Sequence, residues 1–207
     1  MKLYFAKGTI AVASAIALNE AGLVYTPVPL NFGAAEQRSE DFLAINPKGR
    51  VPALVTDHGI ITETIAILEY VAAIAPDAGL VPSDPYTAAQ MRSVMSYCAS
   101  TMHVNHAHLM RGPRWASEQS SFDDMRENVP RTMTESAGFI ETHALKGPFV
   151  MGDHVSLADA HLFVLCTWLE GDGVEVAKFP KVAQFLETMW VRPSVQQAKA
   201  DGLFRDT

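Results

Sequence analysis

The stretch INPKGRVPALV, Ile45 to Val55, sets a proline at the point where a loop becomes a strand. The residues Asn46–Gly49 have turn chemistry, and the apolar residues after Pro52 favour a strand. Because proline has no N–H to donate, Pro52 must begin a strand or lie at an edge or a bulge. Two interpretations are open: a trans proline that starts the strand, or a cis Val51–Pro52 bond, which costs an X–Pro pair only about 0.5–1 kcal/mol. The cis form would turn the Val51 backbone outward, where it can pair with a peptide-like ligand.

A second polar segment, Thr62-Glu63-Thr64, lies where the next predicted strand runs into a helix. Helix N-termini carry free N–H groups and a partial positive charge, so they hold carboxylates. Thr64 adds a hydroxyl donor, and Glu63 adds a carboxylate for an ammonium group. A ligand with an amino-acid head and a peptide body would satisfy both Val51 and this segment. The plainer alternative makes one threonine an N-cap and Glu63 a partner of the helix dipole, and both can hold together.

The residues around these two segments alternate between strand and helix patterns. Pro27 and Pro29 mark one strand as an edge strand, and Asp57-His58-Gly59 marks a hairpin. The order β-α-β-α-β-β-α predicts a mixed sheet with helices on its faces. Strands are predicted at 2–6, 24–30, 52–56 and 60–62, and helices at 11–21, 39–45 and 65–75.

The segment PDAGLVPSDP, residues 76–85, holds three prolines and a glycine and is typical of a linker. Beyond it the patterns predict helices only. Ser156 and Asp159 have the spacing of a capping box. We therefore expect an α/β domain over 1–76, a linker over 77–85 and an all-helical domain over 86–207. The helices of the second domain are predicted at 86–108, 122–143, 156–169 and 182–191.

The composition excludes several classes of protein. The chain has 207 residues, 48% of them hydrophobic, and a formal net charge of -7. This acidic balance argues against nucleic-acid binding and offers no basic run for a membrane surface. Cys98 and Cys166 form no CxxC, which argues against a zinc or dithiol motif. The apolar run at 9–18 resembles a signal peptide only loosely, and no segment approaches the ~20 apolar residues of a membrane span. We expect a cytoplasmic protein.

The segments NPKGRVPAL (46–54) and TETIAILEYVA (62–72) resemble the N-terminal thioredoxin-like domain of glutathione transferases. The segments GDHVSLAD (152–159), FPKV (179–182) and RPSV (192–195) are similar to the family's helical part, and the opening MKLYFAKG is closest to its bacterial beta class. The resemblance implies a thioredoxin-like domain followed by an all-α domain. It also implies a homodimer, glutathione as co-substrate, a small electrophile as second substrate and no tightly bound cofactor.

The resemblance further implies where glutathione lies. Its cysteinyl backbone would pair with Val51 beside a cis Pro52, and its γ-glutamyl group would sit on Glu63-Thr64. Its glycine carboxylate needs a cation, for which Lys48 and Arg38 are the candidates.

The chain departs from the beta-class pattern at the position that activates the thiol. Beta-class members carry cysteine there, whereas this chain has Ile10, which has no donor. Glutathione must react as a thiolate, and Thr9 is the first candidate to stabilise it, with an ordinary N-cap as the alternative. We interpret Ser14 as a small buried residue and Tyr4 as a core residue.

The predicted helical domain offers a second group of candidates in the run MHVNHAHLMR, residues 102–111. The beta class places a histidine here to face the glutathione sulfur, and His106 or His103 would fill that role. The run contains no carboxylate or cysteine, so we expect no metal site. Candidates for the electrophile pocket are Asn105, Arg111, Arg114 and Trp115.

These features together predict a glutathione transferase that activates the thiolate for attack on an electrophile, with Thr9 and His106 as catalytic residues. One alternative is a glutathione-binding or ligand-binding protein that has lost catalysis, which Ile10 favours. Another is a glutathione-dependent peroxidase or disulfide reductase, although the missing cysteine weighs against it.

Overall fold

The computed structural model describes residues 1–205, which form two compact units. The first contains Met1–Pro82 together with the chain from Trp190 onward, and the second contains Ser83–Met189. The unit boundary thus falls inside the expected linker. The expectation that 86–207 forms one helical domain differs from this division, because the chain after Met189 packs on a helix of the first unit.

The first unit contains a four-stranded sheet in the order β2-β1-β3-β4. Strand β1 (Lys2–Phe5) pairs in parallel with β2 (Thr26–Pro29) and antiparallel with β3 (Ala53–Thr56). Strand β4 (Gly59–Thr62) pairs antiparallel with β3 through a two-residue turn at Asp57 and His58. The two prolines of β2 therefore lie on an edge strand, where their missing N–H groups interrupt no ladder.

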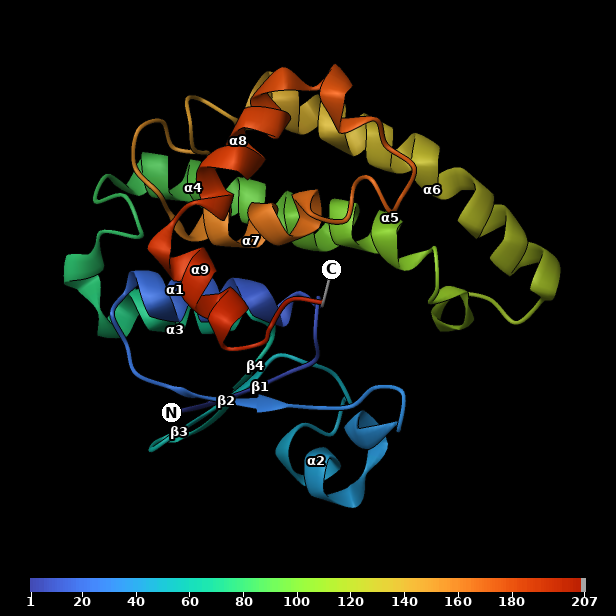
Figure 1. Ribbon diagram of the computed structural model, residues 1–207, viewed down its shortest axis with the longest axis horizontal. Coiled ribbons are helices and arrows are strands. Elements are labelled where there is room, and N and C mark those ends of the chain that lie inside the picture. The colour runs from blue at the N-terminus through green and yellow to red at the C-terminus, as the bar shows by residue number, and fades with distance from the viewer. Residues whose placement is uncertain (206–207) are drawn as a thin grey trace. The chain divides into compact units, whose positions relative to one another are not determined.

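The side chains of β1 alternate between the two faces of the sheet. Leu3 and Phe5 are buried on one face, and Tyr4 contacts Phe42 of α2 (Glu40–Ile45) with ring centroids 5.7 Å apart. Figure 1 shows α1 (Ala11–Glu20) and α3 (Thr64–Ile74) on one side of the sheet and α2 on the other. The sheet is therefore covered on both faces, as the predicted βαβαββα order requires.

Helix α9 (Pro193–Ala200) returns the C-terminal segment to the first unit, where it packs along α1. Arg192 donates to both carboxylate oxygens of Glu20 at 2.6 and 2.8 Å, and the Ser194 hydroxyl donates to the same carboxylate. All eight residues from Ala11 to Leu18 are buried, because α1 lies between the sheet, α3 and α9. Ser14 is among them, as the sequence predicted.

The second unit is helical and is built around α7 (Leu157–Cys166), all of whose residues are buried. The Asp159 carboxylate accepts hydrogen bonds from the Ser156 N–H, the Ser156 hydroxyl and the Val150 N–H, which confirms the predicted capping box. Burial raises the pKa of Asp159 to about 6, against the opposite effect of these bonds. Within residues 1–205 no helix has the length and apolar character needed to cross a bilayer.

The long helices of the second unit contain π-helical turns that the sequence pattern did not predict. The helix expected at 86–108 consists of α4 (Pro85–Tyr97), a π-helical segment (Cys98–Met102) and α5 (His103–Ala107), which run on from one another in Figure 1. The helix expected at 122–143 is α6 (Gln119–Phe139) followed by a second π-helical segment (Ile140–Ala144). The remaining helix, α8, spans Pro180–Trp190.

Candidate functional site

Sheet register brings three segments of the first unit to one end of the sheet. Tyr4 of β1 pairs with Ala53 of β3, and Ala53 pairs with Thr62 of β4. The chain after β1, the chain before β3 and the chain after β4 therefore leave the sheet at the same end. These segments carry Thr9, Val51-Pro52 and Glu63-Thr64, which the sequence singled out. We refer to this end of the sheet as the candidate site.

The Val51–Pro52 peptide bond is cis, so the structure adopts one of the two forms that the sequence left open. Pro52 is buried, and Val51 is half-buried. Among residues 1–205 the backbone N–H and C=O of Val51 have no hydrogen-bond partner. A donor and an acceptor on one residue thus remain for an extended ligand to pair with.

Glu63 holds an unusual backbone conformation at the start of α3. Its φ is +77°, which is rare for a residue with a side chain and is found mostly at turns and functional sites. The conformation places Glu63 at the N-cap position of α3, with an exposed side chain that caps no backbone N–H. The start of α3 therefore keeps its free N–H groups and the Thr64 hydroxyl beside a carboxylate.

Lys48 contacts this segment, and the sequence did not predict that contact. Its ammonium donates to the Thr62 hydroxyl at 2.7 Å and forms an ion pair with the Glu63 carboxylate. Lys48 lies within the turn held by Asn46, whose side chain donates to the Arg50 carbonyl and accepts from the Lys48 N–H. Arg38 is exposed at the end of a short 3₁₀ turn (Glu36–Arg38).

Thr9 and Ile10, the two residues expected near the thiol, lack a free hydrogen-bond donor for different reasons. The Thr9 hydroxyl donates to the Ala6 carbonyl at 2.7 Å, so its proton is already used within the turn. Ile10 occupies the N-cap position of α1 and is 6% exposed, with no side-chain cap. Neither side chain therefore directs a free hydrogen-bond donor toward a ligand.

In the second unit, His106 pairs with a residue that the sequence did not single out. Its Nδ1 lies 2.9 and 2.8 Å from the two carboxylate oxygens of Asp172, and its ring stacks on Trp168 with centroids 4.1 Å apart. Asp172 is 2% exposed. A buried carboxylate at Nδ1 fixes the tautomer and the orientation of an imidazole and leaves Nε2 for a partner. Asp172 follows His106 by 66 residues, so no local pattern announces the contact.

The other histidines of this run have separate surroundings. His103 contacts the edge of Trp168 with centroids 5.3 Å apart, and His108 contacts Trp115 at 4.6 Å. His161 of α7 is buried, and the resulting desolvation, assisted by His103, lowers its pKa to about 3. Residues 1–205 hold no group of three or more histidine, cysteine or acidic side chains that would suit a metal ion.

The four residues predicted for an electrophile pocket differ in their surroundings and their exposure. The Asn105 amide donates to the Thr132 carbonyl and the Ser136 hydroxyl of α6, so it serves the packing of α5 on α6. Arg111 and Arg114 are exposed around a 3₁₀ turn (Gly112–Arg114), and Trp115 is 45% exposed.

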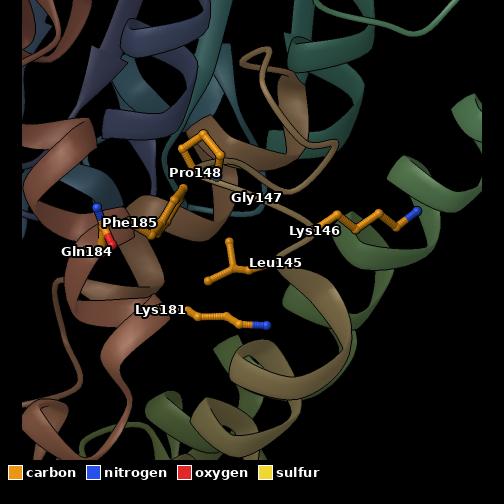
Figure 2. Close-up of a pocket in the computed structure, with 7 residues that line it drawn as sticks. All are labelled: Leu145, Lys146, Gly147, Pro148, Lys181, Gln184 and Phe185. Atoms are coloured by element: carbon orange, nitrogen blue, oxygen red, sulfur yellow. The ribbon is translucent and has the colours of Figure 1, made fainter.

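A cavity of about 290 Å³ lies elsewhere in the second unit. Figure 2 shows Leu145, Pro148 and Phe185 around it. The Lys146 ammonium at its rim bonds to Gln90, and the adjoining start of α8 is capped by the Glu141 carboxylate through the Lys181 and Val182 N–H groups. The Lys146 ammonium and the first N–H groups of α8 thus have partners within the protein.

Comparison with known proteins links both units to one family. The family model for the N-terminal domain of glutathione S-transferases matches residues 1–73, and the model for the C-terminal domain matches residues 110–200. A crystal structure of a glutathione transferase homologue from Sulfitobacter, with bound glutathione, is 58% identical, covers 98% of each chain and has a TM-score of 0.96.

More distant relatives span two activities. A bacterial beta-class glutathione S-transferase from Sphingomonas chungbukensis is 31% identical with a TM-score of 0.85, over 98% of this chain and 100% of that one. A maleylacetoacetate isomerase from Pseudomonas aeruginosa is 29% identical over 96% of this chain and 95% of its own length.

Proposed function

The chain belongs to the glutathione S-transferase family, and on that premise we propose that it binds glutathione at the candidate site and presents the thiolate to an electrophilic small molecule. The observation that carries the proposal is the convergence of Val51 and Glu63-Thr64 at one end of the sheet. A Sulfitobacter homologue with 58% identity that was crystallised with bound glutathione supports it.

Each part of glutathione meets a group of suitable chemistry. The unpaired N–H and C=O of Val51 match the backbone of the cysteinyl residue. The Glu63 carboxylate matches the γ-glutamyl ammonium, while the Thr64 hydroxyl and the start of α3 match the γ-glutamyl carboxylate. Lys48 and Arg38 remain the cations for the glycine carboxylate. Binding by many weak contacts orients the sulfur for attack.

The chemical step is attack of the thiolate on the acceptor. A free thiol has a pKa near ~8.5, so activation means lowering that pKa in the bound state. His106, oriented by Asp172, is the proposed catalytic residue of the second unit. Thr9, in the turn before α1, is the proposed catalytic residue of the first unit. The electrophile contacts proposed for the second unit are Asn105, Arg111, Arg114 and Trp115. We further propose a homodimer that works in the cytoplasm on toxic electrophiles.

An ultraviolet difference titration of glutathione with the protein, from pH 5 to 9, tests the proposal because it reports binding and thiol ionisation together. We expect saturable binding and a bound thiol that ionises below its free value. Glu63→Gln is expected to weaken binding about five- to tenfold, since it removes the charge opposite the ammonium. Glu170→Gln, a charge change in the second unit, is the matched control. Absence of binding by the wild-type protein would refute the proposal.

A second candidate function is glutathione binding without catalysis. Ile10 and the use of the Thr9 proton by Ala6 favour it, because neither residue offers the thiol a donor. Binding with an unshifted thiol pKa and no turnover would support this function. Turnover is measured with several acceptors, namely aryl halides, hydroperoxides and, because one relative is a maleylacetoacetate isomerase, a maleyl-type cis-alkene.

A further inference from the structure

The C-terminal segment brings an arginine to the turn that precedes α1. The Gly8 N–H donates to the Leu203 carbonyl at 2.8 Å, which fixes the segment against the turn. A β-carbon placed on Gly8 would lie 2.8 Å from Cγ and 2.9 Å from Nε of Arg205. The stem and guanidinium of Arg205 therefore lie directly over Gly8, in space that only glycine leaves open.

The segment that carries this arginine is held in place within the first unit. Leu203 is fully buried, and its N–H donates to the Ala198 carbonyl at the end of α9. The Tyr25 hydroxyl donates to Asp201 at 3.1 Å, which ties the same segment to the chain before β2. Gly8 has a φ of +68°, so the turn and the approach of Arg205 require glycine for separate reasons.

The turn under Arg205 is one of the three segments of the candidate site. It follows β1, whose Tyr4 pairs with Ala53, and the residue before Ala53 is Pro52. A cysteinyl group paired with Val51 would thus place its sulfur beside the turn at Gly8 and Thr9. This is the place where the chain has Ile10 and where the Thr9 proton is used by Ala6.

We propose that the Arg205 guanidinium supplies the positive charge that stabilises the glutathione thiolate in this protein. The inference rests on the proposed binding of glutathione at the candidate site. The thiol proton leaves to water, and the guanidinium stays protonated throughout. An opposite charge within about 4–6 Å favours the ionised form of an acid, and the partial charge at the start of α1 acts in the same direction.

Other charged and titratable groups around this end of the sheet also contribute to the electrostatic potential at the thiol. Lys7 lies in the same turn, and Tyr4 lies on β1 with its ring against Phe42. Lys48 and Glu63 neutralise one another as an ion pair, and Asp201 accepts from Tyr25. Arg205 is exposed, so we expect an effect of moderate size rather than that of a buried ion pair.

The test compares Arg205→Gln with Arg205→Lys in the full-length protein. Bound glutathione is titrated by thiolate absorbance from pH 5 to 9, and kcat and KM are measured with an aryl halide. We expect Arg205→Gln to raise the pKa of the bound thiol by about 0.5–1 and to lower kcat about three- to tenfold at pH 6.5, with a smaller change in KM. Arg205→Lys is expected to retain most of the wild-type pKa. Lys199→Gln on α9 changes the net charge equally and is the control.

Three outcomes would overturn the inference. In the first, Arg205→Gln binds glutathione with the wild-type thiol pKa. In the second, Arg205→Gln changes only the affinity for glutathione, which would make Arg205 a ligand of a glutathione carboxylate. In the third, the wild-type protein binds glutathione without shifting the pKa of its thiol. Failure of the wild-type protein to bind glutathione at all is a different result, because it refutes the proposed function. A melting curve for each variant separates loss of charge from loss of folding.

Discussion

At the scale of single residues, Lys48 occupies the place proposed for part of the ligand. Its ammonium contacts Thr62 and Glu63, and Glu63 is the group proposed to receive the γ-glutamyl ammonium of glutathione. Glutathione can displace it and offer a glycine carboxylate in exchange, whereas the terminal carboxylate of γ-glutamylcysteine lies on the cysteinyl residue, one residue short of that position. Lys48→Met should therefore bind γ-glutamylcysteine about two- to fivefold more tightly than wild type and glutathione more weakly. The factor is small because exposed ion pairs contribute roughly 0–1 kcal/mol.

Isothermal titration of both peptides against both proteins measures this exchange. Arg50→Met is a matched control, because Arg50 is an exposed cation two residues along the same loop. Equal effects of Lys48→Met on the two peptides would show that Lys48 does not distinguish them.

His106 and Asp172 form a second residue-scale pair, and its coupling can be measured without reference to catalysis. Replacing His106 by phenylalanine leaves the carboxylate of Asp172, which is 2% exposed, without its histidine partner. The replacement should therefore lower the free energy of unfolding by about 2–4 kcal/mol. The double variant H106F/D172N should recover about 1–2 kcal/mol of that loss, because no unpaired charge remains. Urea denaturation of the four proteins gives the coupling free energy.

His108 serves as the control for this cycle. It lies two residues from His106 and contacts Trp115 instead of a carboxylate. His108→Phe combined with D172N should show additive effects within about 0.5 kcal/mol. Additivity in the His106 cycle as well would mean that the hydrogen bonds to Asp172 contribute no net stability.

At the scale of elements, the contact of α9 with α1 depends on the ionisation of Glu20. Burial raises the pKa of Glu20, but the hydrogen bonds from Arg192 and Ser194 outweigh it, so the pKa lies below its ordinary value of 4.5. A carboxyl whose pKa is lower in the folded state stabilises the protein above its unfolded pKa. This stability is lost as the pH falls through 4.5 toward the folded value.

Glu20→Gln tests this dependence. At pH 7 the variant should lose about 1–3 kcal/mol, because the bidentate ion pair is gone and Arg192 remains largely buried. As the pH falls from 4.5 through the folded-state pKa, the difference from wild type should shrink, since Glu20 then becomes protonated in the folded state as well. Urea midpoints at pH 7, 5 and 4 measure it. Glu175→Gln, which breaks an exposed pair with Lys178, should change little at any pH. A difference for Glu20→Gln that stays constant as the pH is lowered until the wild-type protein loses stability would contradict the ionic explanation.

At the scale of the whole molecule, the sequence predicted what local pattern and turn chemistry control. The order of strands and helices along the first unit, the Asp57–His58 hairpin and the capping box at Ser156 and Asp159 each depend on residues close in the chain. The family match to both domains agrees with the resemblance of residues 46–54 and 62–72 to the N-terminal domain and of residues 152–159, 179–182 and 192–195 to the helical part.

The sequence could not supply contacts between distant segments. Asp172 lies 66 residues from His106, and nothing near either residue marks the pair. The use of the Thr9 proton by Ala6 depends on the exact turn geometry, which several residue types would allow. The return of the chain after Met189 to α1 was missed because a helix pattern gives the buried face of a helix and not its partner.

This return makes the first unit discontinuous in sequence, with a consequence for truncation. A chain that ends at Met189 lacks Val195, Ala198 and Leu203, which are fully buried, and lacks the partners of Glu20. Because a domain is stable by only about 5–15 kcal/mol, the loss should unfold the first unit. Hydrogen exchange should then be fast in α1 and the sheet but remain slow in α7 of the second unit. A chain ending at Arg205 keeps every one of these contacts and should match wild type. Protection of α1 in the 1–189 chain would mean that the sheet and α3 suffice to hold this helix.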